Sequence, residues 1–91
     1  NQDYINDFKS KILKTKNRWY EELSKSKKFK VYDSKGYVLR VYSEDRDYVR
    51  QIYDKLYENK IVVNLVDGLN LVFAVSLNKE IENIIFRYLC I

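Results

Sequence analysis

The sequence predicts an α+β fold in which a long N-terminal helix is followed by two units of two strands and a helix. Three observations lead to this prediction. Apolar side chains recur at helical spacing through residues 2–28, which contain neither Gly nor Pro. Two later stretches are rich in β-branched and aromatic residues around a glycine, and a helical pattern follows each of them. The order α-ββα-ββα predicts an antiparallel four-stranded sheet with helices packed on one face.

Length and composition predict one domain. Ninety-one residues suffice for a single hydrophobic core, and an apolar fraction of 46% is ordinary for a globular chain. With two Gly and no Pro there is little room for linkers, so we expect residues 1–91 to form a single α+β domain.

The first element is predicted to be an amphipathic helix over residues 2–28. At 100° per residue, five apolar side chains fall on one stripe, which Leu13 and Tyr20 flank. That stripe consists of Ile5, Phe8, Ile12, Trp19 and Leu23.

Two hairpins are predicted next. Residues 29–33 and 37–42 form the first, and Gly36 between them can adopt the positive φ that a tight turn needs. Residues 61–66 and 69–75 form the second around Asp67-Gly68, the strongest hairpin signal in the chain. Both faces of residues 61–66 are apolar, so we expect the second hairpin at the centre of the sheet and the first nearer an edge.

A helix is expected after each hairpin. Ser43 would cap the first, with Glu44 and Asp45 on its opening turn, and Ser76 or Asn78 would cap the second. The expected buried stripes are Val49, Ile52, Tyr53 and Leu56 in one helix, and Ile81, Ile84, Ile85, Tyr88 and Leu89 in the other. The core is expected to include Ile52, Val63, Leu65, Phe73 and Ile85.

The two ββα units align at an offset of 33 residues. Either an internal duplication or shared patterning of apolar residues accounts for such a match. The aligned pairs are Leu39 with Val72, Val41 with Ala74, Ser43 with Ser76, Ile52 with Ile85, Tyr53 with Phe86, and Leu56 with Leu89.

The predicted element order resembles that of one half of a LAGLIDADG homing endonuclease. Those enzymes carry a small-residue helix interface that ends in Gly and an acidic metal ligand just before the first strand. The corresponding stretch here reads Ser24-Lys25-Ser26-Lys27-Lys28, with neither an acid nor a Gly. The resemblance is therefore one of topology, and it implies no activity and no family membership.

The residues needed for common catalytic sites are missing from the sequence. There is no His, and Cys90 is the only cysteine, expected to be a small core residue. Glu58-Asn59-Lys60 has the Glu-x-Lys spelling of many metal-dependent nucleases, but it falls at a predicted helix end, where Lys and Asn suit the cap. We expect no enzyme, no cofactor and no metal site.

Positive charge is concentrated in the first part of the chain. Residues 1–40 hold eleven Lys/Arg against five Asp/Glu, and residues 41–91 hold six against eight. Lys11, Lys14, Arg18 and Lys25 share a helix face away from the apolar stripe. Such a face can neutralise phosphates, steer an acidic partner, or serve only solubility. Membrane-surface binding is not expected, because the core needs the apolar stripe.

Aromatic residues interleave with this charge. Trp19 is central to the helix stripe and is expected in the core, whereas Tyr32 shares a strand face with Lys30, and Tyr42 shares one with Arg40. An exposed face of this composition could recognise nucleic acid or protein. The candidate binding residues are Lys11, Lys14, Arg18, Lys25, Lys27, Lys28, Lys30, Tyr32, Arg40 and Tyr42.

Two functions are compatible with these features. The first is a non-catalytic basic module that contacts nucleic acid through its first helix and first hairpin, with weak sequence specificity because base-reading motifs are absent. The alternative is a small protein-binding inhibitor or adaptor from a phage or mobile element, of the anti-defence type, that acts on a host nucleic-acid-binding protein. Cysteine usage and the lack of a secretory signal favour the cytoplasm, and the residue usage hints at a low-GC bacterium or its phage.

Overall fold

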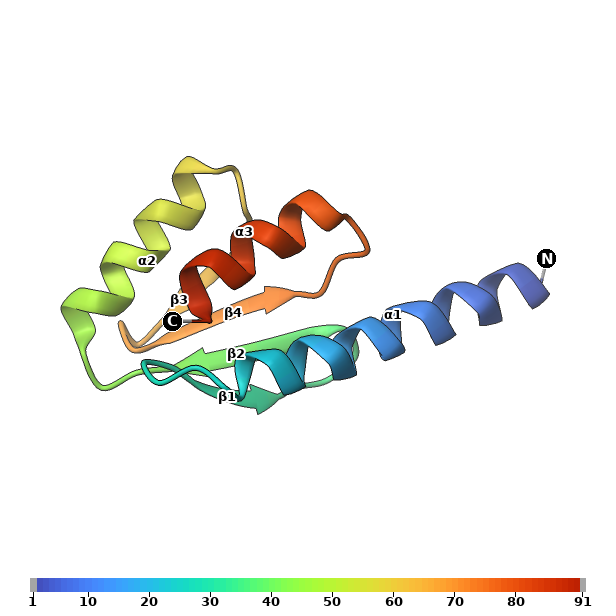
Figure 1. Ribbon diagram of the computed structural model, residues 1–91, viewed down its shortest axis with the longest axis horizontal. Coiled ribbons are helices and arrows are strands. Elements are labelled where there is room, and N and C mark those ends of the chain that lie inside the picture. The colour runs from blue at the N-terminus through green and yellow to red at the C-terminus, as the bar shows by residue number, and fades with distance from the viewer. Residues whose placement is uncertain (1, 91) are drawn as a thin grey trace.

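The computed structural model describes residues 2–90, and the side chains of residues 7–90. Its elements follow the predicted order α-ββ-α-ββ-α, which confirms the α+β fold class (Figure 1). They are α1 (Gln2–Leu23), β1 (Lys30–Asp33), β2 (Val38–Tyr42), α2 (Arg46–Glu58), β3 (Asn64–Val66), β4 (Asn70–Ala74) and α3 (Lys79–Leu89).

The strands form one antiparallel sheet in the order β1-β2-β4-β3. Each hairpin therefore supplies one central and one edge strand, so the expectation that the whole second hairpin is central is wrong. β3 is an edge strand of only three residues. Val62 and Val66, whose apolar character suggested burial on both faces, are 87% and 41% exposed.

One face of the sheet carries the hydrophobic core. Its strand residues Val31, Leu39, Val41, Leu71 and Phe73 are all buried. They join buried side chains from all three helices in a single cluster. α1 contacts β1 and β2, α2 contacts β4, and α3 contacts both other helices. Within residues 2–90 no helix packs on the opposite face of the sheet.

α1 is five residues shorter than predicted and packs through only part of its length. After Leu23 the Ser- and Lys-rich stretch offers nothing to bury, and Ser26 Oγ accepts a hydrogen bond from the Phe29 amide, which competes with further helix. The N-terminal turns of α1 project from the body (Figure 1). Accordingly Ile12 is buried, whereas Phe8 is 44% exposed.

The rest of the predicted α1 stripe has a mixed outcome. Trp19 and Leu23 are buried as expected, and the flanking Leu13 and Tyr20 are exposed. The side chain of Ile5 lies outside the described residues.

The two later helices have similar caps. Asp45 caps α2 by accepting from the Tyr48 amide, so the expectation that Ser43 is the cap is wrong. Ser43 Oγ accepts from the Asp45 amide instead, because the helix begins two residues later than predicted. Asn78 caps α3, and Ser76 Oγ accepts from the Asn78 amide.

The predicted core and turns are largely confirmed. Ile52, Val63, Phe73 and Ile85 are buried, whereas Leu65 is only half-buried because β3 is at the edge. Gly36 and Gly68 have φ values of 64° and 72°, and Asp67 before Gly68 has a φ of 56°. These are the positive values that the two hairpin turns were expected to need.

Candidate functional site

The uncovered face of the sheet, called the open face below, gathers side chains from all four strands. Strand residues alternate between the two faces, so the side chains next to each core residue point to the open face. The register aligns them in two rows across the sheet. The first row is Lys30, Tyr42, Asn70 and Val66, and the second is Tyr32, Arg40, Val72 and Asn64.

Arg40 lies near the middle of the open face and is held by two neighbours. Its Nη1 donates to Oδ1 of Asn70 at 2.7 Å, and its guanidinium carbon lies 4.4 Å from the centre of the Tyr32 ring. Asn70 is itself fixed, because its amide donates to the Val66 carbonyl. Two planar contacts therefore orient the guanidinium. Sequence reasoning missed Asn70, and only the pairing of β2 with β4 brings it beside Arg40.

The open face is electropositive. Its strand residues include the cations Lys30 and Arg40 and no carboxylate. Asp33, the acid nearest in β1, points to the helix side, where it pairs with Lys16 of α1. Anions that approach this face therefore meet two cations and the half-buried rings of Tyr32 and Tyr42.

Lys27 and Lys28 continue this positive surface beyond the end of the sheet. They lie in the loop between α1 and β1, and line a shallow depression together with Lys30 and Tyr42. Lys28 also reaches the ring of Tyr48, with its Nζ 5.6 Å from the ring centre. Glu44 lines the same depression and is the acid closest to this group.

The remaining predicted residues, Lys11, Lys14, Arg18 and Lys25, lie elsewhere. All four are exposed; Lys11, Lys14 and Arg18 lie on α1 outside its buried stripe, and Lys25 lies in the turn after it. The expected single surface of first helix and first hairpin is therefore divided, because α1 packs on the core side of the sheet. Acids also balance much of the helix row, since Lys11 pairs with Asp7 and Lys25 with Glu22.

Arg18 has a structural partner rather than a free guanidinium. It is bonded to the Glu82 carboxylate of α3, which also accepts from the Trp19 indole at 2.8 Å. Burial alone would raise the pKa of Glu82, but the hydrogen bonds from Arg18 and Trp19 outweigh it and leave that pKa below the ordinary value. The sequence analysis did not predict that Glu82 is buried. The available signal was its position between Ile81 and Ile85, on the apolar side of the helix.

Lys16 was also missed as a structural residue. Its buried ammonium donates to the carbonyls of Ser34 and Gly36 at 2.6 and 2.8 Å and pairs with Asp33. The hydrogen bond from Lys16 is the main reason that the pKa of Asp33 is lowered. Lys16 lies four residues after Ile12 and therefore on the buried stripe of α1. Its bonds anchor α1 to the turn between β1 and β2.

The candidate catalytic motif is part of a helix end. Glu58 is the last residue of α2, and Asn59 is its C-cap, whose side-chain amide donates to the Lys55 carbonyl at 2.7 Å. Lys60 follows with a φ of 62°. Within residues 2–90 no three His, Cys, Asp or Glu side chains gather closely enough to hold a metal ion.

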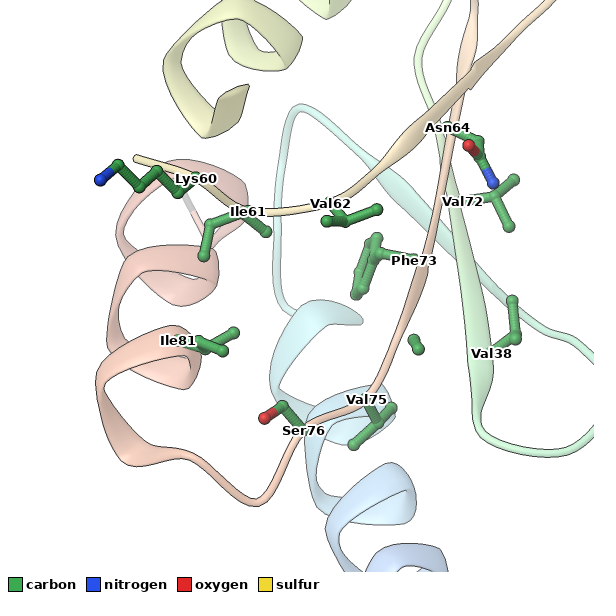
Figure 2. A pocket seen from close by; sticks show the side chains of 11 residues that line it. Val38, Lys60, Ile61, Val62, Asn64, Val72, Phe73, Val75, Ser76 and Ile81 are labelled. Carbon is green, nitrogen blue, oxygen red and sulfur yellow. The ribbon is translucent and has the colours of Figure 1, made fainter. Parts of the chain in front are cut away.

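A hollow of about 400 Å³ lies where the chain before β3 diverges from β4. Figure 2 shows Ile61 and Val62 on one side of this gap. Phe73 of β4 and Val75, which follows β4, lie on the other side. Its lining is mostly aliphatic, with Lys60, Asn64 and Ser76 as the polar side chains.

Cys90 behaves as a structural residue. It is half-buried at the C-cap of α3, and its thiol lies 3.6 Å from the Glu22 carbonyl oxygen. Burial, aided by the negative charge of Glu22, raises the pKa of this thiol and so disfavours the reactive thiolate. Among the described residues no helix combines the length and apolar character that crossing a bilayer requires.

Comparison of the chain with protein-family models, with curated proteins and with solved structures gives no match. The functional interpretation therefore depends on the geometry of the open face.

Proposed function

We propose that this chain is a non-catalytic module that binds single-stranded nucleic acid on the open face of its sheet, with weak sequence specificity. The observation that carries the proposal is the oriented Arg40 guanidinium, held between Asn70 and Tyr32 at the middle of an electropositive, uncovered sheet. An oriented guanidinium can stack on a base or bind a phosphate with two parallel donors.

The neighbouring residues suit a strand that crosses the sheet. The Tyr42 ring and the Arg40 guanidinium, which lies over Tyr32, present planar surfaces on which unpaired bases can stack, whatever the base. Lys27, Lys28 and Lys30 lie along the adjoining margin, where they can neutralise backbone phosphates. A flat sheet face suits splayed single strands better than the grooves of a duplex.

Weak specificity follows from the polar groups that remain. Asn70 is buried and already bonded to Arg40 and to the Val66 carbonyl, which leaves Asn64 as the exposed amide in the two rows of this face. Stacking and phosphate contacts carry little sequence information.

Matched charge removal tests the proposal. One variant, K27Q/K28Q/K30Q, removes three charges beside the open face, and its control, K9Q/K11Q/K14Q, removes three from α1. Arg18 is left in place because it holds the Glu82 carboxylate. For single strands each lost phosphate contact lowers the log–log salt slope by about 0.7, so the first variant should lose about 2 in slope and the control almost nothing.

Fluorescence anisotropy with labelled single- and double-stranded oligonucleotides at several salt concentrations measures this. R40Q should weaken binding to all single-stranded sequences by a similar factor. A larger slope change in the α1 control than in the open-face variant would contradict the proposed surface. Absence of binding to either oligonucleotide at low salt would reject nucleic-acid binding altogether.

Absence of oligonucleotide binding would favour the rival function, a protein-binding inhibitor or adaptor of phage or mobile-element origin. Tyr and Arg on one face also suit a protein interface. That reading predicts little binding to bare DNA or RNA at about 150 mM salt and a tight complex with a host nucleic-acid-binding protein, disrupted by R40Q.

A further inference from the structure

The outer edge of β3 exposes backbone groups that have no partner. β3 pairs with β4 through Asn64 and Val66, opposite Val72 and Asn70. In an antiparallel ladder the residue between two bonded positions turns its N–H and C=O the other way, so those of Leu65 point outward. Among the described residues, neither Leu65 nor Val63 has a backbone hydrogen-bond partner beyond the strand ladder.

Apart from the shortness of β3, this edge lacks the charge and cover that usually keep sheet edges apart. No charged residue occurs from Ile61 to Val66, and Val62 is almost fully exposed. The opposite edge strand, β1, begins at Lys30, ends at Asp33 and has α1 packed against it. Natural edge strands are commonly protected by charge or cover, and an unprotected apolar edge is a template for another strand.

We propose that a second copy of this chain pairs with the β3 edge, antiparallel and centred on Asn64, to form a symmetric dimer with a continuous eight-stranded sheet. The outward groups belong to residues 63 and 65, and a two-fold axis through residue 64 bonds residue 63 of each copy to residue 65 of the other.

The side chains are self-complementary in this register. On the open face, Val62 lies opposite Val66 of the second copy, and the two Asn64 amides face each other. The charges also match, because Lys60 precedes the segment and Asp67 follows it. Antiparallel pairing centred on Asn64 places Lys60 of each copy opposite Gly68 of the other, one position from its Asp67, at both ends of the interface. This charge complementarity identifies the occupant as a second copy rather than an arbitrary strand.

The helix side of the interface is complementary too. A depression lies beside this edge, and its lining is mostly apolar or aromatic, with two charged residues: Tyr53, Tyr57, Glu58, Lys60, Ile61, Val62 and Val63. Leu65, half-buried in one chain, lies opposite Val63 of the second copy, where it can enter that depression. The contact involves one short strand and its neighbours, so we expect a weak, concentration-dependent dimer at the small end of protein interfaces.

Disulfide crosslinking tests the register directly. In a Cys90→Ser background, Asn64→Cys places two thiols at a non-hydrogen-bonded pair, with Cα atoms about 4.5 Å apart, within the range that a disulfide requires. Val66→Cys is the matched control, because residue 66 faces residue 62 and its own copy lies about 14 Å away along the strand, at about 3.4 Å per residue. Mild oxidation should give covalent dimer with the first variant and very little with the second.

Charge substitution tests the same pairing without cysteine. Val62→Lys with Val66→Lys sets like charges opposite each other twice and should raise the dimer dissociation constant at least about tenfold. Val62→Lys with Val66→Glu should restore dimerisation, because only in this register does residue 62 face residue 66. Leu13→Lys, on exposed α1, controls for added charge and should leave the dimer unchanged.

Sedimentation equilibrium from micromolar to millimolar concentration gives the dissociation constants. A wild type that stays monomeric throughout, equal crosslinking of the two cysteine variants, or a Lys/Glu pair no better than the Lys/Lys pair would overturn the proposal. Dimerisation is measured without nucleic acid, so its outcome is separate from that of the open-face binding test.

Discussion

Lys60 illustrates how a single residue is held in an unfavourable backbone conformation by its surroundings. Its φ of 62° lies in the left-handed region, which lysine rarely adopts. The Lys60 amide donates to the Tyr57 carbonyl and the Ile61 amide to the Leu56 carbonyl, both at 2.9 Å. These two bonds form the helix-ending motif in which Gly normally occupies the left-handed position, and burial of Ile61 enforces it.

Replacing Lys60 with Gly should therefore stabilise the fold. Relief of the left-handed strain exceeds the added flexibility of the unfolded chain, so we expect a gain of about 0.5–1 kcal/mol in the free energy of unfolding. Lys60→Ala removes the same charge but keeps a Cβ, and should show no such gain. Urea unfolding at low protein concentration measures both, and a less stable Gly variant would show that the strain is not at this position.

At the scale of elements, the two ββα units are alike in their helices but not in their strands. The caps Asp45 and Asn78 are 33 residues apart, and the preceding Ser43 and Ser76 make the same bond to the cap amide. The alignment of Leu39 with Val72 at this offset does not hold in the structure, however, because Leu39 is in the core and Val72 is on the open face. The helices of the two units correspond at a spacing of 33 residues, but the strands do not. A shift of one residue along a strand moves each side chain to the other face of the sheet.

α1 also differs along its length, and truncation of its apolar residues should show this. Ile12→Ala removes a buried side chain that packs in the core, and should cost about 2–5 kcal/mol. Phe8→Ala, on the projecting turns, should cost less than about 1 kcal/mol because that ring is already in contact with water. Thermal and urea unfolding compare the two. Similar losses would mean that the first turns of α1 pack against the body.

For the whole molecule, the distribution of charge decides how stability depends on pH. The chain carries a net charge of +4 and has no histidine, so no side chain of that type titrates near neutrality. Glu82 joins α1 to α3 through Arg18 and Trp19 with a lowered pKa. A carboxylate whose pKa is lower in the folded chain than in the unfolded chain stabilises the fold fully above its unfolded pKa.

That contribution is lost as the pH falls through the folded pKa of Glu82, below the ordinary value of 4.5. We therefore expect the free energy of unfolding to be nearly constant from about pH 6 to 8 and to decrease steadily below about pH 4.5. Glu82→Gln should lower stability at pH 7 by about 1–3 kcal/mol, because Arg18 loses its anion, and should make the acid-side decrease shallower. If the free energy of unfolding of that variant fell just as steeply below about pH 4.5, the decrease would belong to other carboxylates.

Much of the fold could be predicted because its signals are local. The periodicity of 3.6 residues in α2 and α3 and the positive φ at Gly36 and Gly68 depend on neighbours a few residues away. The candidate site was predicted in part. Lys30, Tyr32, Arg40 and Tyr42 do share one sheet face, because alternation along adjacent strands is also a local property.

The sequence by itself determined the element order, the hairpin turns and most of the core, since each follows from short-range geometry and the spacing of apolar side chains. Only the tertiary structure decided the strand order, the burial of Lys16 and Glu82, the place of Asn70 beside Arg40, and the separation of the basic residues of α1 from the open face. These features arise from contacts between residues far apart in the chain. Which strands pair, and which cation finds an anion, depends on the packing of the whole molecule rather than on local pattern.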